Sequence, residues 1–458
     1  MTLSNENKSI DTFTIENNSL KHLKPNLQLN ISLKIIKYLG TWPPVSSWRN
    51  IYYIFTLFSF IFILGIYLVV QLINIFVFWG NIEVMVASTF LLMTNSVHAY
   101  KICVIIKNQK RIQLLFDTIS SELFTKNFDK YERIFTWYAW SGIKHHIAYQ
   151  SFGTMAVFCW GFVPISNAIT GNERQLPMDG WYPYDTKLSP AFELTCGHQA
   201  VAVIIACCHN IGMDTLINGF INVACCQLEV IKQNILSIDD GDKNVHQEIN
   251  QSVQHIQSIF GTVIMYQLIA NCLIICLTAF HVVQMTVYIP AEIFGMMMYM
   301  CCMTYQIFIF CWNGNELTIQ SETLAFTAIT SNWWKFDKKY KRSLGILITR
   351  SHKPMIFKAG PLINLSLQTF MKWCGSGNIA PTNDSLGPFN KTDADTPVAS
   401  SIGYTYFNIL RPQCFALEYP IVSCEKKDSK RIVEKKCLEY NLDTKQNMTE
   451  QWFDNPDF

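Results

Sequence analysis

Long stretches without a charged side chain constrain the fold of this 458-residue chain more than any other feature. A helix needs about 20 consecutive apolar residues to cross a bilayer, and only helices and closed barrels satisfy their backbone hydrogen bonds in lipid. The apolar runs are continuous rather than alternating, which favours helices over a barrel. Asp, Glu, Lys and Arg are all absent from residues 50–82, 84–100, 145–172, 195–213, 249–291 and 293–315.

These stretches predict an all-α fold, a seven-transmembrane helical membrane protein. Charged residues make up only 15% of the chain, against about 25% in soluble proteins. Residues 1–50 lack the apolar core of a cleavable signal peptide, so the first span is expected to remain as an anchor. The fourth and fifth runs exceed the bilayer thickness and are expected to continue as helices into the cytoplasm. The expected spans are 51–76, 82–106, 142–167, 191–222, 259–284 and 292–312, followed by an irregular seventh.

The distribution of Lys and Arg predicts the orientation, because cytoplasmic loops collect these residues. Six occur in residues 1–50, seven in 101–133 and eight in 335–358, whereas the connections near Gly80 and Pro290 have none. The alternation predicts a cytoplasmic N-terminus and an external C-terminus. The predicted parts are a cytoplasmic N-terminal segment (1–50), spans one to six (51–312), a cytoplasmic connection (313–358), an interrupted seventh span (359–410) and an atypical polar tail (411–458).

Aromatic and thioether side chains gather in the outer halves of the third and sixth spans. Methionine adapts to varied apolar shapes, and aromatic walls suit a pocket for a small apolar molecule. Ordinary helix packing is the better explanation for each residue taken alone; the pocket is predicted from the group as a whole. The candidate ligand-binding residues are Phe158, Trp160, Met296, Tyr299, Met300 and Met303.

A second group of candidates is polar, and we expect these residues to have structural or gating roles. Asp214 interrupts the fourth span; an acid at membrane depth is a functional candidate, and a packed polar residue is the alternative. Asn313, Gly314, Asn315 and Glu316 stand at the expected end of the sixth span. They indicate either a simple helix boundary or a packed joint that transmits motion between spans.

The predicted outer loop has a distinctive composition. Residues 176–185 are rich in Pro, Gly, Trp and Tyr, which predicts either an ordered lid or an anchor at the membrane interface.

Most of the sixteen cysteines lie in or beside apolar runs, where thiols act as small hydrophobes. Intramembrane acids, bases and histidines are too sparse for an enzyme. We expect no catalytic residues, no metal site and no cofactor.

Several motifs, taken in order, resemble the insect odorant receptor family. They span about residues 20–371 and comprise Leu176–Asp185, Asp214–Leu216, Gln227–Glu229, Asn271–Leu277, Cys311–Leu317, Ser331–Trp334, Arg350–Pro354, Ala359–Gly360 and Leu365–Phe370. The resemblance implies a ligand-gated, nonselective cation channel in the plasma membrane of olfactory sensory neurons. It also implies a hetero-oligomer, tetrameric in the family, with a shared co-receptor, a volatile small-molecule ligand, contact with membrane lipid and no nucleic acid.

The resemblance further favours an odorant-tuned subunit, because the long cytoplasmic insertion expected of the co-receptor is absent between spans four and five. A gustatory-type receptor channel is the nearest alternative. A G-protein-coupled receptor is less favoured, since it would need an external N-terminus and a basic-flanked acidic motif after the third span.

The C-terminal part departs from the family pattern. Apolar character begins after Pro354 and stops at Lys372, and a short apolar run at Ile402–Leu410 resembles the end of the family's pore helix. We therefore predict that Trp373–Ala399 is an insertion from a retained intron or a faulty gene model, which would break the pore helix. The tail after Arg411 is equally foreign to the family.

Overall fold

The computed structural model describes residues 27–42, 49–125, 128–171, 174–236, 243–284, 290–331, 333–335, 338–351, 353–361 and 363–375. All of these belong to one compact unit, Met1–Ala399; the second unit, Ser400–Phe458, lies outside the described residues. Most of the predicted insertion, the run Ile402–Leu410 and the tail after Arg411 therefore also lie outside them.

The described elements are almost all helices, which confirms the predicted all-α membrane fold. They are α2 (Leu27–Tyr38), α3 (Arg49–Phe60), the π-helix η1 (Ile61–Gly65), α4 (Ile66–Val77), α5 (Ile82–Lys107), α6 (Gln109–Ile119), α7 (Glu122–Thr125), α8 (Glu132–Thr170), α9 (Ala191–Leu236), α10 (Lys243–Gln284), α11 (Pro290–Thr330), the 3₁₀-helix η2 (Trp333–Lys335), α12 (Lys338–Ser351), β1 (Lys358–Ala359), β2 (Ile363–Asn364) and α13 (Leu367–Gly375).

Six of the described helical segments are long and apolar enough to cross a membrane, and each overlaps one of the six regular spans predicted from the sequence. The first combines α3, η1 and α4; the others are α5, α8, α9, α10 and α11. The 46 residues of α9 extend for about 69 Å at 1.5 Å per residue, more than twice the hydrocarbon thickness of a bilayer. The expected lengthening of the fourth and fifth spans is thus present in α9 and α10.

The sixth span differs from the prediction, because α11 does not end near Asn313 but continues to Thr330. The side-chain amide of Asn313 donates hydrogen bonds to the carbonyl of Ile309 and to Oδ1 of Asn218 on α9, both at 3.0 Å. These tertiary contacts satisfy the side chain within the bundle, so the local tendency of Asn and Gly to end a helix is overridden.

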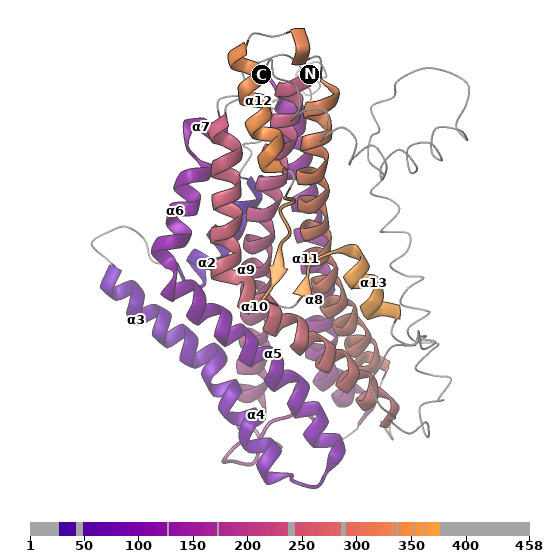
Figure 1. Ribbon diagram of the computed structural model, residues 1–458. Helices are drawn as coiled ribbons and strands as arrows, with labels where there is room; N and C mark the ends of the chain where they lie inside the picture. Colours follow the sequence, from indigo (N-terminus) through magenta and orange to yellow (C-terminus); the bar gives the residue numbers. More distant parts are fainter. Residues whose placement is uncertain are drawn as a thin grey trace, which may run out of the picture. The chain divides into compact units, whose positions relative to one another are not determined.

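Helix α11 forms the centre of the bundle. In its most apolar 18-residue stretch, 72% of the residues are buried, against 22% for the first span. It packs against α8, α9 and α10, while α5 packs against both α4 and α10 (Figure 1). The short helix α2 packs along α9. This arrangement leaves the first span at the margin, where apolar side chains such as Ile54 and Phe58 stay exposed, as suits a helix facing lipid.

A small hairpin stands where the seventh span was expected to begin. Strand β1 pairs antiparallel with β2, with Lys358 opposite Asn364, and the turn uses Gly360 at a φ of +60°. The amide of Gly360 donates to the carbonyl of Gly261 on α10 at 2.8 Å. The hairpin delays the next helix, α13, to Leu367, and the nine residues of α13 are too few to cross a bilayer.

Candidate functional site

A cavity lies inside the bundle between α5, α8, α9 and α11, with Ile63 of η1 and Tyr67 of α4 completing its wall. Its volume is about 90 Å³, several times the roughly 10–15 Å³ that one water molecule needs. Most of the wall is aliphatic, aromatic or sulfur-containing. Such a lining suits a small organic molecule better than an ion.

Three of the six predicted ligand-binding residues line this cavity: Trp160, Tyr299 and Met303. The ring centroids of Trp160 and Tyr299 are 5.2 Å apart, and both side chains are buried. The Tyr299 hydroxyl is hydrogen-bonded to the Thr94 hydroxyl on α5. The two aromatic rings therefore form a fixed wall shared by α8 and α11.

The other three predicted residues lie elsewhere. Met296 and Met300 are buried in α11 but do not line the cavity. Phe158 is 67% exposed and stacks on Phe162 along the outer side of α8, at 6.4 Å between ring centroids. The separation has a simple cause: two residues along an α-helix turn the side chain by about 200°, so Phe158 and Trp160 cannot face the same side.

The outer loop closes one side of the cavity. Met178 lines it, and the backbone of Met178 is held at both ends by Gln199 of α9, which accepts from its N–H and donates to its carbonyl, each at 3.1 Å. The same amide donates to the hydroxyl of Tyr182 at 3.0 Å. Gly180 approaches the first span so closely that a Cβ there would lie 2.5 Å from Cγ1 of Val70. The loop is thus held against α9 and the first span, with Met178 at the cavity wall, and its role as a lid stays a prediction.

Several lining residues were not among the sequence candidates. Thr94, Asn95 and His98 bring polar groups from α5 into the wall, and Tyr67 does so from α4. The sequence contains a pattern that could have identified two of them. Thr94 and His98 are polar residues one helical turn apart in a charge-free run, so they lie on the same face of the helix.

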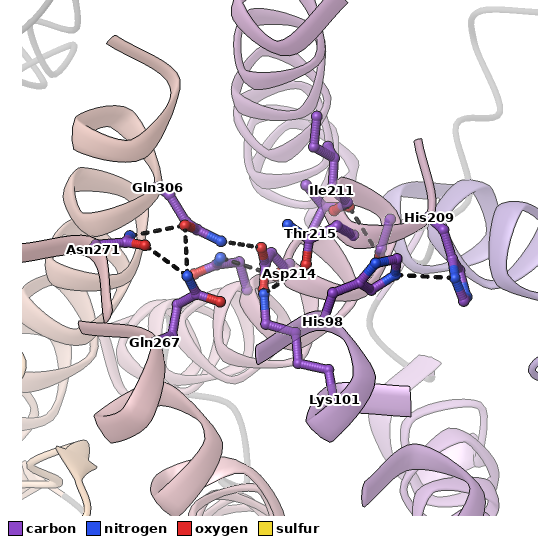
Figure 2. A network of polar contacts seen from close by, with 12 residues as sticks. His98, Lys101, His209, Ile211, Asp214, Thr215, Gln267, Asn271 and Gln306 are labelled. Atoms are coloured by element: carbon purple, nitrogen blue, oxygen red, sulfur yellow. Dashed lines mark hydrogen bonds and ion pairs between the residues drawn. The ribbon is translucent and has the colours of Figure 1, made fainter. Parts of the chain in front are cut away.

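A buried ion pair (Figure 2) is hydrogen-bonded to two residues of the cavity wall, Tyr149 and Asn210. Nζ of Lys101 on α5 is 2.6 Å from Oδ1 of Asp214 on α9, and the two side chains are 2% and 1% exposed. Lys101 was counted from the sequence among the cytoplasmic cations, but it faces the interior and also donates to Oδ1 of Asn210 at 2.9 Å. Removing one partner of such a pair would leave an uncompensated buried charge, which costs roughly 3–5 kcal/mol.

The carboxylate of Asp214 connects four helices. In addition to Lys101, it accepts from the hydroxyl of Tyr149 on α8 at 3.2 Å and from the amide of Gln306 on α11. Gln306 in turn accepts from Asn271 and Gln267 of α10, at 2.8 and 3.0 Å (Figure 2). Because Tyr149 and Asn210 also line the cavity, the floor of the cavity and this network share side chains.

The network continues toward the predicted gating residues on α11. Asn218, one turn beyond Asp214, accepts from Asn313 at 3.0 Å. At Gly314 a Cβ would lie 2.6 Å from Cβ of Leu365, so α11 and the segment before α13 are in close contact. Oδ1 of Asn315 accepts from the backbone N–H of Leu367 at 3.5 Å, at the first residue of α13.

Glu316 belongs to a separate buried cluster. It accepts hydrogen bonds from the Tyr138 hydroxyl at 3.3 Å and from Gln320 at 2.7 Å. The described residues contain no group of three or more His, Cys, Asp or Glu side chains suited to a metal ion. The twelve cysteines from Cys103 to Cys311 are free thiols.

These observations define the class: a multi-pass α-helical membrane protein with a cavity inside its bundle. The family described as 7tm Odorant receptor matches residues 81–375, well over half of the chain. The chain therefore belongs to the odorant receptor family, a receptor family and not an enzyme class. Odorant receptor Or1 of Anopheles gambiae is 24% identical over 387 residues, covering 75% of this chain and 91% of that protein.

A solved structure shares the fold. The insect olfactory receptor OR5 from Machilis hrabei in complex with eugenol matches with a TM-score of 0.66 at 16% identity, covering 84% of this chain and 97% of that chain. A different similarity involves a smaller part of the sequence. Phospholipase A2 of Bombus pensylvanicus is 30% identical over 128 residues, covering 18% of this chain and 92% of that protein.

Proposed function

We propose that this chain is an odorant-tuned subunit of a ligand-gated, nonselective cation channel, which works with a shared co-receptor in the plasma membrane of olfactory sensory neurons. The observation that carries the proposal is the apolar, aromatic-walled cavity enclosed by α5, α8, α9, α11 and the outer loop, in a chain of the odorant receptor family. The ligand class is a small, mainly apolar volatile molecule, for which dispersion and aromatic contact supply most of the affinity.

The cavity and the buried network together support a mechanism of population shift. A ligand can favour the open state only by binding that state more strongly than the closed one. Ligand contacts at Tyr149 and Asn210 are one hydrogen bond away from the Lys101–Asp214 pair. From there, Asn218 and Asn313 lead to the contact between α11 and the start of α13. Asp214, Asn313, Gly314 and Asn315 are proposed to carry the signal along this route, whereas Glu316 stabilises the neighbouring helices.

Co-expression with a co-receptor tests the proposal. We expect odorant-evoked cation current when the receptor part is expressed together with the co-receptor, and none when it is expressed alone. The full chain and a form whose residues after Gly375 are replaced by the equivalent part of Or1 should be tested in parallel, at equal surface protein. Robust current without a partner would contradict the tuning-subunit role. Absence of odorant current from both forms would contradict the receptor role.

A further inference from the structure

Tyr67 carries a buried hydroxyl that no neighbour among the described residues satisfies. The side chain is 5% exposed and lines the cavity, and its hydroxyl has no hydrogen-bond partner among the described residues. The ring is fixed by stacking on His198, at 6.0 Å between ring centroids. A buried hydroxyl without a partner is unfavourable, so a hydrogen-bond acceptor supplied by a ligand would be stabilised at this point.

The other hydroxyl-, amide- and imidazole-bearing side chains of the wall each take part in at least one hydrogen bond. The Tyr299 hydroxyl pairs with Thr94, Asn95 donates to Gln71 at 3.0 Å, and His98 pairs with His209 at 3.2 Å. Tyr149 and Asn210 are held by the ion pair described above. Tyr67 is thus the hydroxyl of the described wall that is free to bind a ligand without breaking an existing hydrogen bond.

We propose that the Tyr67 hydroxyl is the specificity-determining donor of the cavity, and that the preferred ligands are apolar volatiles with one oxygen acceptor, such as ketones, esters or ethers. This inference rests on the proposed function and narrows its ligand class. The carbonyl or ether oxygen accepts from Tyr67, and the hydrocarbon part fills the space toward Trp160 and Met303. A hydrocarbon of the same shape gains only the apolar contacts.

The test compares matched probes on the purified full chain and its Tyr67→Phe variant. Ligand-induced increases in melting temperature are measured for acetophenone with isopropylbenzene and for hexyl acetate with 2-methylnonane. The wild-type chain should bind the oxygenated member of a pair about threefold to tenfold more strongly, and Tyr67→Phe should remove that preference while leaving hydrocarbon binding unchanged. Tyr184→Phe is the matched control, because Tyr184 lies in the outer loop, is 48% exposed and does not line the cavity.

An oxygen preference that persists in Tyr67→Phe would overturn the inference, as would equal binding of both pair members by the wild-type chain. Stabilisation of the wild-type chain by no probe of either kind would count instead against the cavity as an odorant site, and so against the proposed function.

A second inference comes from the similarity to phospholipase A2. The family match ends at Gly375, which is also the last residue of α13. The chain continues from 376 to 458, and these 83 residues are 18% of the 458, the same share that the phospholipase similarity covers. The N-terminal residues before 81 are excluded as its place. They contain α2, which packs on α9, and the first span, which supplies Ile63 and Tyr67 to the cavity.

The cysteines of this C-terminal segment stand in a polar context. Cys414, Cys424 and Cys437 lie in the polar tail after Arg411, whereas most of the cysteines between Cys103 and Cys311 lie in or beside apolar runs. Cysteines in a short polar segment are typical of small secreted proteins. The segment contains no histidine, since the last one in the chain is His352. Histidine is the most frequent general base, so we assign the segment no hydrolytic activity.

We infer that residues 376–458 are a phospholipase A2-type segment joined to the receptor in place of the rest of its seventh span. On this inference Ile402–Leu410 belongs to the joined segment and is not the returning end of a pore helix. The foreign part is therefore continuous from 376 to 458, whereas the sequence alone suggested an insertion, Trp373–Ala399, and a foreign tail after Arg411 with a family segment between them.

Three forms distinguish these possibilities when each is recorded with the co-receptor at equal surface protein. Replacing residues 376–458 by the equivalent part of Or1 should give odorant current. The full chain, and a form that lacks only Trp373–Ala399, should give less than a tenth of that current. Full current from the undeleted chain would overturn the inference. Current restored by the short deletion would overturn it in favour of an insertion.

Discussion

Phe158 and Trp160 are separated by one residue on α8, yet only Trp160 faces the cavity. At the scale of single residues, the lining of the cavity depends on which side of a helix a residue occupies, more than on its type. The same holds for Lys101, whose charge suggested a cytoplasmic loop but whose side chain is paired with Asp214 inside the bundle.

Truncating Trp160 tests the cavity at this scale. We expect Trp160→Ala to reduce odorant potency about threefold to tenfold at equal surface protein, because one aromatic contact contributes roughly 0.5–1.5 kcal/mol beyond its buried area. Phe158→Ala is the matched control on the same helix and should leave the dose–response curve unchanged. Equal effects of the two substitutions would remove Trp160 from the binding site.

At the scale of elements, the contacts between helices carry the proposed coupling. Helices α5, α8, α9 and α11 meet at the carboxylate of Asp214, and α10 joins them through Gln267 and Asn271. The side chains that hold the bundle together here are polar, in a region where lipid supplies no hydrogen bonds. A change in helix packing must therefore rearrange this network as a unit.

Neutralising both charges of the pair tests its role in coupling. The double variant Lys101→Met with Asp214→Asn removes the ion pair without leaving a buried charge, so folding should be retained. We expect ligand-induced thermal stabilisation to persist. Odorant current, recorded in the form whose residues after Gly375 are replaced by the equivalent part of Or1, should fall at least tenfold. Arg174→Gln with Glu193→Gln, an exposed pair at 3.7 Å, should change neither measurement. Unaltered current in the Lys101–Asp214 variant would contradict the coupling role.

The close contact of α11 with Leu365 can be tested through a glycine. Gly314→Ala places a methyl group 2.6 Å from Cβ and 2.8 Å from the carbonyl oxygen of Leu365, and we expect lower thermal stability by about 1–3 kcal/mol with reduced surface protein. Gly161→Ala has no atom within 4 Å of its new Cβ and should be neutral or slightly stabilising, since Ala favours a helix. The melting temperature of purified protein measures both effects.

At the scale of the whole molecule, the orientation in the membrane decides which end of the bundle receives the ligand. The cavity lies beneath the loop 174–190, which the charge pattern places outside. Odorants would then enter from the external side, and the network below the cavity would lead toward the cytoplasm.

Glycosylation mapping tests this orientation. Arg174→Thr completes an acceptor sequon at Asn172, and we expect that variant to gain a glycan, seen as a mobility shift that a glycosidase removes. The natural sequon at Asn17 should remain unmodified, because the N-terminus is expected in the cytoplasm. A glycan at Asn17 would reverse the assigned orientation. Loss of the Arg174–Glu193 contact should matter little, since both partners are about half exposed.

The sequence by itself determined the membrane class, the six regular spans and the family motifs. Each depends on properties that are local or additive along the chain: runs without charge, their length against the bilayer, and the positions of Lys and Arg. It also identified Trp160, Tyr299 and Met303 as pocket residues, because aromatic and thioether side chains gather at one end of two spans.

Only the tertiary structure decided which residues enclose the cavity and which helices Asp214 joins. Tyr67, Thr94 and His98 face the cavity because of how the first two spans are oriented about their axes relative to α8 and α9. That orientation is set by packing between distant segments. The continuation of α11 through Asn313 and Gly314 has the same cause. Asn218 and Leu365, far away in the sequence, satisfy and cover residues that would otherwise favour the end of a helix.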